Sequence, residues 1–308
     1  MKNVVVCKIH LILSMIVLGV VLCVTPVWSF DQPSVNLGFT SFLDGGPPAG
    51  SGVYFAEYIQ YYDADRFADF PAPSADVEVW VSLNQLLYQS DTPILLGGKW
   101  GLDVIVPVVG LESDPLPDNN AGVGDLLIGP YIQWDPIMGE NGPIFMHRIE
   151  LQTIIPTGKY DDDKALNPGS NFWSFNPYWA ATLFITPKLT ASWRIHYLWN
   201  DKNDDPFVGF GADDTQAGEA IHGNFTVAYE VIPKQLRIGI NGYYFKQISD
   251  SETNGHKVDG REKVFAVGPG MVWHLNRDNH LFFNAYFESG AAHRTEGERY
   301  NIRFVHHF

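Results

Sequence analysis

The chain has 308 residues, of which 45% are hydrophobic and 14% aromatic, and its 35 acidic residues outnumber its 20 basic ones for a net charge of −15. Carboxylates at this density repel phosphate, so the composition argues against a nucleic-acid partner. Beyond residue 30, no apolar run approaches the ~20 residues that a membrane-spanning helix needs, which excludes a helical membrane protein.

The first 29 residues have the pattern of a secretory signal peptide. Lys2 and Lys8 form a basic start, residues 11–24 are an apolar run, and the small residue Ser29 stands where cleavage would follow. An uncleaved anchor is the alternative, but this run is shorter than a spanning helix. We therefore expect a signal peptide at 1–29 and cleavage near Ser29.

Both cysteines, Cys7 and Cys23, lie inside this leader. Leu22 precedes Cys23 where lipid attachment needs a small residue, so we expect no lipidation. We also expect no disulfide and no cysteine metal ligand in the mature chain. Residues 30–51 follow, too polar and glycine-rich for a strand, and we expect either a plug inside a barrel or a periplasmic tail.

From residue 52 onward, segments that alternate between apolar and polar side chains recur about twelve times, the pattern of strands with one apolar and one wet face. In the clearest, 189–200, Trp193, Ile195 and Tyr197 share one face while Arg194 and His196 share the other. The segments are 52–62, 76–88, 99–109, 123–134, 144–155, 171–185, 189–200, 216–231, 235–247, 263–275, 280–288 and 299–308. Bacterial barrels use an even number of antiparallel strands. The fold class that we predict for 52–308 is an all-β, transmembrane, antiparallel outer-membrane β-barrel of about 12 strands.

The links between these segments alternate in length. Short links at 186–188, 232–234 and 276–279 alternate with long polar ones at 63–75, 111–121, 156–170, 201–215, 248–261 and 289–298. Outer-membrane barrels have short periplasmic turns and long outer loops. A soluble sandwich would also alternate apolar and polar residues, but it needs no such rhythm.

The end of the chain also favours a barrel. Tyr300, Ile302, Phe304 and the terminal Phe308 share one phase, which resembles the C-terminal signal read by the barrel-assembly machinery. His306 departs from the apolar residue usual in that phase.

The face opposite the apolar row should line the lumen, because an Arg or Lys facing lipid near the midplane costs ~2–4 kcal/mol. By this rule Glu78, Trp80 and Asn84 of the segment 76–88 should point inward. The candidate channel residues are Trp80, Asp103, Tyr131, Arg148, Glu150, Tyr178, Arg194, His196, His222, Arg237, Tyr243, Glu288 and Arg303. The alternative for most of these residues is that acids and bases pair with one another to fill a narrow barrel and do not contact a solute.

Short pieces spread over nearly the whole mature chain resemble one known family. They are Val35-Asn36-Leu37-Gly38, Ala64-Asp65-Arg66-Phe67, Gly124-Asp125, Pro156-Thr157-Gly158-Lys159-Tyr160-Asp161, Asn167-Pro168-Gly169-Ser170-Asn171, Asn241-Gly242-Tyr243-Tyr244 and Gly268-Pro269-Gly270. Together they resemble the outer-membrane transporter family named for the meta-pathway of phenol degradation. The resemblance implies an outer-membrane protein associated with the breakdown of aromatic or other hydrophobic compounds and leaves the cargo open.

We therefore predict a channel for passive uptake of small hydrophobic or aromatic compounds in the cell outer membrane of a Gram-negative bacterium. A general polar porin and a non-transporting surface barrel are the alternatives. The expected partners are outer-membrane lipid and lipopolysaccharide, the barrel-assembly machinery and the solutes, with no nucleic acid.

We expect neither an enzyme nor a cofactor. The sequence contains no Gly-x-Ser-x-Gly motif, no phosphate-binding loop and no zinc-binding motif. An outer-membrane hydrolase that uses Ser174, Ser192 or His196 stays an alternative. No metal site is expected either, because Pro206 stands where a calcium loop starting at Asp201 needs glycine.

Overall fold

The computed structural model describes residues 32–33, 35–47, 50–69 and 76–308, so the predicted signal peptide lies outside the described residues. They form strands and one short 3-10 helix, η1 (Val208–Phe210). None of the helices found in this part of the chain has the length and hydropathy of a membrane span.

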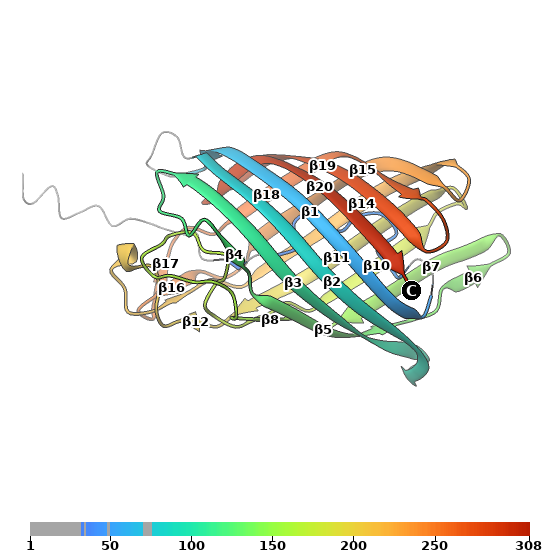
Figure 1. The fold of residues 1–308 in the computed structure, drawn as a ribbon, viewed down its shortest axis with the longest axis horizontal. Coiled ribbons are helices and arrows are strands. Elements are labelled where there is room, and N and C mark those ends of the chain that lie inside the picture. The colour runs from blue at the N-terminus through green and yellow to red at the C-terminus, as the bar shows by residue number, and fades with distance from the viewer. Residues whose placement is uncertain (1–31, 34, 48–49, 70–75) are drawn as a thin grey trace, which may run out of the picture.

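The strands close into an antiparallel barrel whose wall has twelve strand positions, as predicted (Figure 1). The last strand, β20, pairs with the first, β1, and this pairing closes the wall. Nine positions are single strands: β1 (Gly52–Phe67), β2 (Asp76–Leu95), β3 (Gly98–Asp114), β11 (Leu189–Asn200), β14 (Ala220–Ile232), β15 (Leu236–Gln247), β18 (Lys263–His274), β19 (Asn279–Ala292) and β20 (Thr295–His307).

The other three positions are broken strands, which lie side by side between β3 and β11. They are β4 (Ala121–Val123) with β5 (Leu126–Gln133), β7 (Gly142–Glu150) with β8 (Thr153–Ile155), and β9 (Ser174–Phe175) with β10 (Tyr178–Phe184). Single backbone bonds bridge the breaks, as where the Leu151 amide donates to the Pro130 carbonyl at 3.0 Å. Proline has no N–H to donate, so irregular pairing near Pro130 and Pro177 is expected.

Short turns gather at one end of the barrel, which we call the turn end, and long loops at the other, the loop end. Beside the turn end, β6 (Ile137–Gly139) forms a hairpin with β7. At the loop end, β12 (Lys202–Asn203), β13 (Thr215–Gln216), β16 (Ser251–Thr253) and β17 (His256–Val258) form a separate small sheet. The long loop predicted at 289–298 is wrong: β19 and β20 extend until only His293 and Arg294 connect them.

The predicted alternation holds in most strands. In β11, Arg194, His196 and Asn200 are buried inside, while Ile195 and Tyr197 face outward. In β20, Tyr300, Ile302 and Phe304 share the outward face, and Phe308 is exposed just beyond the strand.

Strand β2 reverses the prediction. Val77, Val79, Val81 and Leu83 line the lumen, and Trp80 lies on the outer face with 54% of its surface exposed. Glu78 and Asn84 face outward with Trp80, so the inward placement predicted for all three is wrong. The pairing of Tyr61 with Trp80 and of Tyr62 with Val79 fixes this phase, because buried Tyr62 points inward and its neighbour on β2 must do the same.

Candidate functional site

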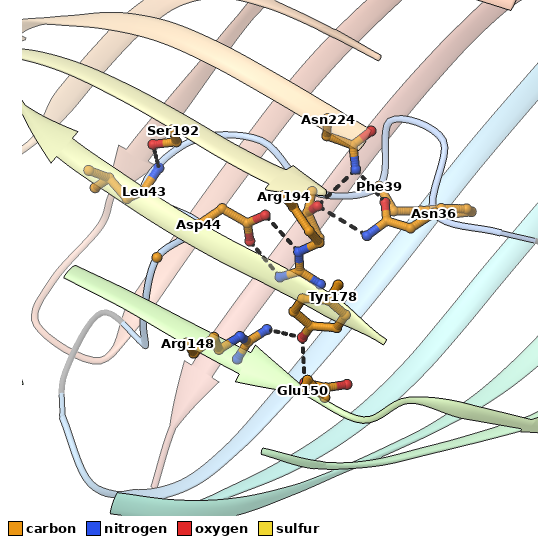
Figure 2. Close-up of polar contacts among 12 residues, drawn as sticks. Asn36, Phe39, Leu43, Asp44, Arg148, Glu150, Tyr178, Ser192, Arg194 and Asn224 are labelled. Carbon is orange, nitrogen blue, oxygen red and sulfur yellow. Dashed lines mark hydrogen bonds and ion pairs between the residues drawn. The ribbon is translucent and has the colours of Figure 1, made fainter. Parts of the chain in front are cut away.

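The N-terminal segment 35–47 lies inside the barrel, against the inner faces of β10, β11 and β14 (Figure 2). Asp44 and Arg194 anchor it with two hydrogen bonds, Nε to Oδ2 at 2.8 Å and Nη2 to Oδ1 at 2.6 Å. Both side chains are almost fully buried, with 5% and 6% exposed. A planar guanidinium and a carboxylate in this two-bond geometry form the strongest kind of ion pair.

Side chains of the wall take the place of a strand partner for the backbone of this segment. The amides of Gly38, Leu43 and Gly45 donate to Asn224, Ser192 and Thr182 at 2.9, 3.1 and 3.0 Å. From further around the wall, Gln60 donates to the Leu37 carbonyl, Asn301 to that of Phe39 and Gln133 to that of Gly45. A buried backbone without hydrogen-bond partners would be costly, so these polar residues of the wall stabilise the segment inside the lumen.

Five further predicted residues gather around Arg194 of this anchor: Asp103, Tyr131, Arg148, Glu150 and Tyr178. The Tyr178 hydroxyl donates to Glu150 and accepts from Arg148, whose Nη2 lies 2.7 Å away. The Arg194 guanidinium lies 4.2 Å from the centre of the Tyr178 ring. Acids, bases and rings therefore form one connected cluster across β3, β5, β7, β10 and β11.

A second cluster lies nearer the loop end and contains the predicted Tyr243 and Glu288. The Tyr243 hydroxyl donates to Glu288 at 2.6 Å, and Tyr62 donates to the same carboxylate at 2.9 Å. Arg299 donates to Tyr243 at 2.8 Å and lies 3.4 Å from Glu288. Every charge in this cluster has an opposite partner, as enclosed charges require.

Four of the five remaining predicted residues, all but the outward Trp80, also point inward, but into different surroundings. His196 and His222 stack with ring centres 4.2 Å apart, and both contact the Asn176 side-chain oxygen at 3.1 Å. Arg237 pairs with Glu230 at 3.3 Å near the turn end. Arg303 is buried beside Phe282. These residues do not form one site.

Apolar residues cover the opposite side of the lumen, and the sequence-based selection of candidates missed them. A cavity of ≈ 270 Å³ lies between the N-terminal segment and the loop end, lined by Leu37 and Phe39 of the segment and by Phe207 and Phe210 of the loop after β12. Apolar side chains of β2, β3, β5 and β8 form one side of its wall: Val77, Val79, Val81, Leu83, Ile105, Pro107, Val109, Leu111, Leu127 and Ile154.

These apolar residues could have been found from the sequence only by dropping the rule that the polar face is the inner one. Residues 104–109 of β3 are apolar on both faces, and that pattern signals a wall with lipid on one side and an apolar lumen on the other. Three charged residues were missed as well. Asp44 lies outside the predicted strands, Arg294 lies in the predicted loop 289–298, and Arg299 lies at the edge of that loop. Among the described residues, no three His, Cys, Asp or Glu side chains are placed to hold a metal ion.

Comparisons with known proteins identify similar folds and the family of the chain. The structure is similar to an outer-membrane channel from Pseudomonas putida F1, with a TM-score of 0.73 and 18% identity over 89% of this chain and 100% of that one. The β domain of the Bordetella autotransporter BrkA has a TM-score of 0.47 and 11% identity over 84% of this chain and 100% of that one. A search of curated proteins found no match. The family model described as "Putative MetA-pathway of phenol degradation" matches residues 60–304, and the chain belongs to this family.

Proposed function

We propose that this chain is a channel of the outer membrane through which small hydrophobic compounds, aromatic ones included, diffuse passively toward the periplasm. The observation that carries the proposal is the apolar cavity wall. The lumen of a general porin is polar. Here the inner faces of β2 and β3 instead offer a continuous series of Val, Leu and Ile side chains beside the cavity.

The dimensions suit a solute with one ring. An engineered protein cavity of about 150 Å³ lined by Leu, Ile and Phe binds benzene, so ≈ 270 Å³ leaves room for a substituted ring. The tyrosines and arginines on the opposite wall offer donors for a hydroxyl or carbonyl substituent. A few polar groups facing an apolar wall are the usual composition of a small-molecule site.

The N-terminal segment serves as a plug in this proposal. Its hydrogen bonds to the wall, the two of the Asp44–Arg194 pair among them, would hold it between the cavity and the turn end. A solute would then cross in two steps, first into the cavity from the loop end and afterwards past a displaced plug. The plug would also limit the leakage of ions.

Reconstitution tests the proposal. Purified protein in planar bilayers should conduct poorly, and removal of residues 35–47 should raise the conductance severalfold. In cells that lack other channels, phenol and toluene should enter faster with the protein than without it, whereas sugars should not. Equal entry of sugars would favour a general polar porin, and no entry of any solute would favour a surface role.

A further inference from the structure

Arg303 differs from the other arginines of the lumen. It is 6% exposed, and its Nε atom is buried with no acceptor. No ion pair of Arg303 occurs among the described residues. Each of the other inward arginines has a partner within hydrogen-bond or ion-pair distance: Arg148 has Tyr178, Arg194 has Asp44, Arg237 has Glu230, Arg294 has Glu262 and Arg299 has Glu288.

Aromatic rings flank the guanidinium of Arg303 instead of a carboxylate. Its central carbon lies 3.5 Å from the centre of the Phe282 ring and 5.6 Å from that of Tyr58. These two residues are its register neighbours on β19 and β1, so all three side chains point into the lumen at one level. The rings hold the cation by cation–π attraction but do not neutralise its charge.

The position of Arg303 places it on the route of a solute. Asn301, two residues earlier on β20, donates to the Phe39 carbonyl of the N-terminal segment at 3.2 Å. Arg303 lies one inward step closer to the turn end. On the proposed route, a solute that moves from the cavity toward the turn end would pass the level of Arg303 after that of Phe39.

We propose that Arg303 binds the carboxylate of aromatic acids, so that the channel takes aromatic carboxylates in addition to neutral rings. A guanidinium matches a carboxylate with two parallel hydrogen bonds, and an anion would supply the counter-charge that the buried cation lacks. Phe282 and Tyr58 would pack against the ring of the same solute. This inference rests on the proposed function and names a second solute class for it.

Calorimetric titration of the detergent-solubilised protein with sodium benzoate and with phenol tests the proposal. Benzoate should bind the wild type and bind Arg303→Gln at least tenfold more weakly, since a hydrogen bond to a charged group contributes ~1.5–3 kcal/mol. Phenol should bind both equally. Arg303→Lys should keep part of the benzoate affinity, because it keeps the charge without the planar fork.

The matched control is Arg66→Gln, which removes the same charge from a side chain that is 62% exposed. It should leave benzoate binding unchanged. Benzoate affinity that is absent in the wild type, or equal in wild type and Arg303→Gln, overturns the inference. Phenol entry into cells distinguishes failure of this inference from failure of the proposed function. If phenol enters while benzoate does not bind, only the inference on Arg303 fails.

An independent observation concerns the outer face of the barrel. Glu57 of β1 and Ser82 and Asn84 of β2 point outward, and Ser82 donates to Glu57 at 3.0 Å while Asn84 donates to Ser82 at 3.2 Å. Apolar residues such as Ile59 and Leu86 surround the three. We call Glu57, Ser82 and Asn84 the outer polar cluster.

This cluster lies at the middle of the lipid-facing band. Outward aromatic residues mark the two edges of such a band. Here Trp80 and Tyr61 are in contact at one edge, and Tyr88 and Trp100 at the other. Asn84 is four residues from Trp80 and four from Tyr88, or about 13 Å along the strand in each direction. Polar groups that face hydrocarbon at this depth are costly.

We infer that the outer polar cluster is the centre of a two-fold interface with a second copy of this chain. A two-fold axis brings the same patch of both copies together, so the patch must complement itself. Within one copy the Asn84 amide donates to Ser82 at 3.2 Å and to the Val106 carbonyl at 3.4 Å. Across a two-fold axis the second of these amide hydrogens would instead meet the Glu57 carboxylate of the other copy, so the cluster complements itself. Polar side chains that hydrogen-bond across an interface are a known means of association in lipid.

Cysteine cross-linking in membranes tests this interface. Residues 30–308 contain no cysteine, so a chain expressed with a cysteine-free leader carries only the one introduced. Val106→Cys, beside the cluster on β3, should cross-link two copies with a short bifunctional thiol reagent. Val227→Cys, equally outward on β14, should not. Asn84→Leu should abolish the Val106→Cys product, and equal products at both positions, or none at either, would overturn the inference.

Discussion

The ion pair between Asp44 and Arg194 gives the sharpest test of the proposed plug. Replacing Asp44 by Asn preserves the shape of the side chain and leaves the Arg194 guanidinium buried without its counter-charge. Loss of one partner from a buried pair costs ~3–5 kcal/mol. We take the lower figure, ~3 kcal/mol, because water can reach a lumen more easily than a protein core. At ~1.4 kcal/mol per factor of ten, the equilibrium between the seated and displaced segment should shift about 150-fold toward the displaced form.

Single-channel recording in planar bilayers measures this shift as the fraction of time spent in the high-conductance state. Asp44→Asn should raise that fraction strongly, whereas Asp63→Asn, which removes a charge from the exposed outer face of β1, should leave it unchanged. The exchange Asp44→Arg with Arg194→Asp should restore part of the closed state. An open fraction for Asp44→Asn equal to that of the wild type would refute the view that this pair holds the segment.

Three further predictions follow from single positions. Gly45→Ala should open the channel as well, because an added Cβ would lie 2.4 Å from the backbone carbonyl of Met146, and the conductance of the variant measures this. Val81→Thr puts a hydroxyl on the cavity wall at nearly constant volume, so toluene entry into cells should fall severalfold while ion conductance stays the same; unchanged toluene entry would argue against the apolar route. Phe308→Ala should lower the amount of folded barrel in the outer membrane, seen as a smaller heat-modifiable band on gels, and normal assembly would show that the terminal ring is not part of the signal.

The polar clusters of the lumen show how far sequence reasoning reaches for the site. Alternation predicted the inward direction of Arg148, Glu150 and Tyr178, because polar side chains in mid-strand avoid lipid. It could not predict that Tyr178 bridges the other two, since that depends on the register between β7 and β10. Whether these residues touch a solute stays a prediction.

The sequence by itself determined the class of fold, because a period of two over about twelve segments admits one apolar and one wet face per strand and the link lengths set the two ends of the barrel. Only the tertiary structure decided which face of β2 points inward, since both faces carry apolar residues and a slip of one residue exchanges them. The neighbouring strands fix that phase. The tertiary structure likewise decided the seat of segment 35–47: Asp44 and Arg194 are 150 positions apart, and no local pattern encodes a contact that exists only once the wall has closed around the segment.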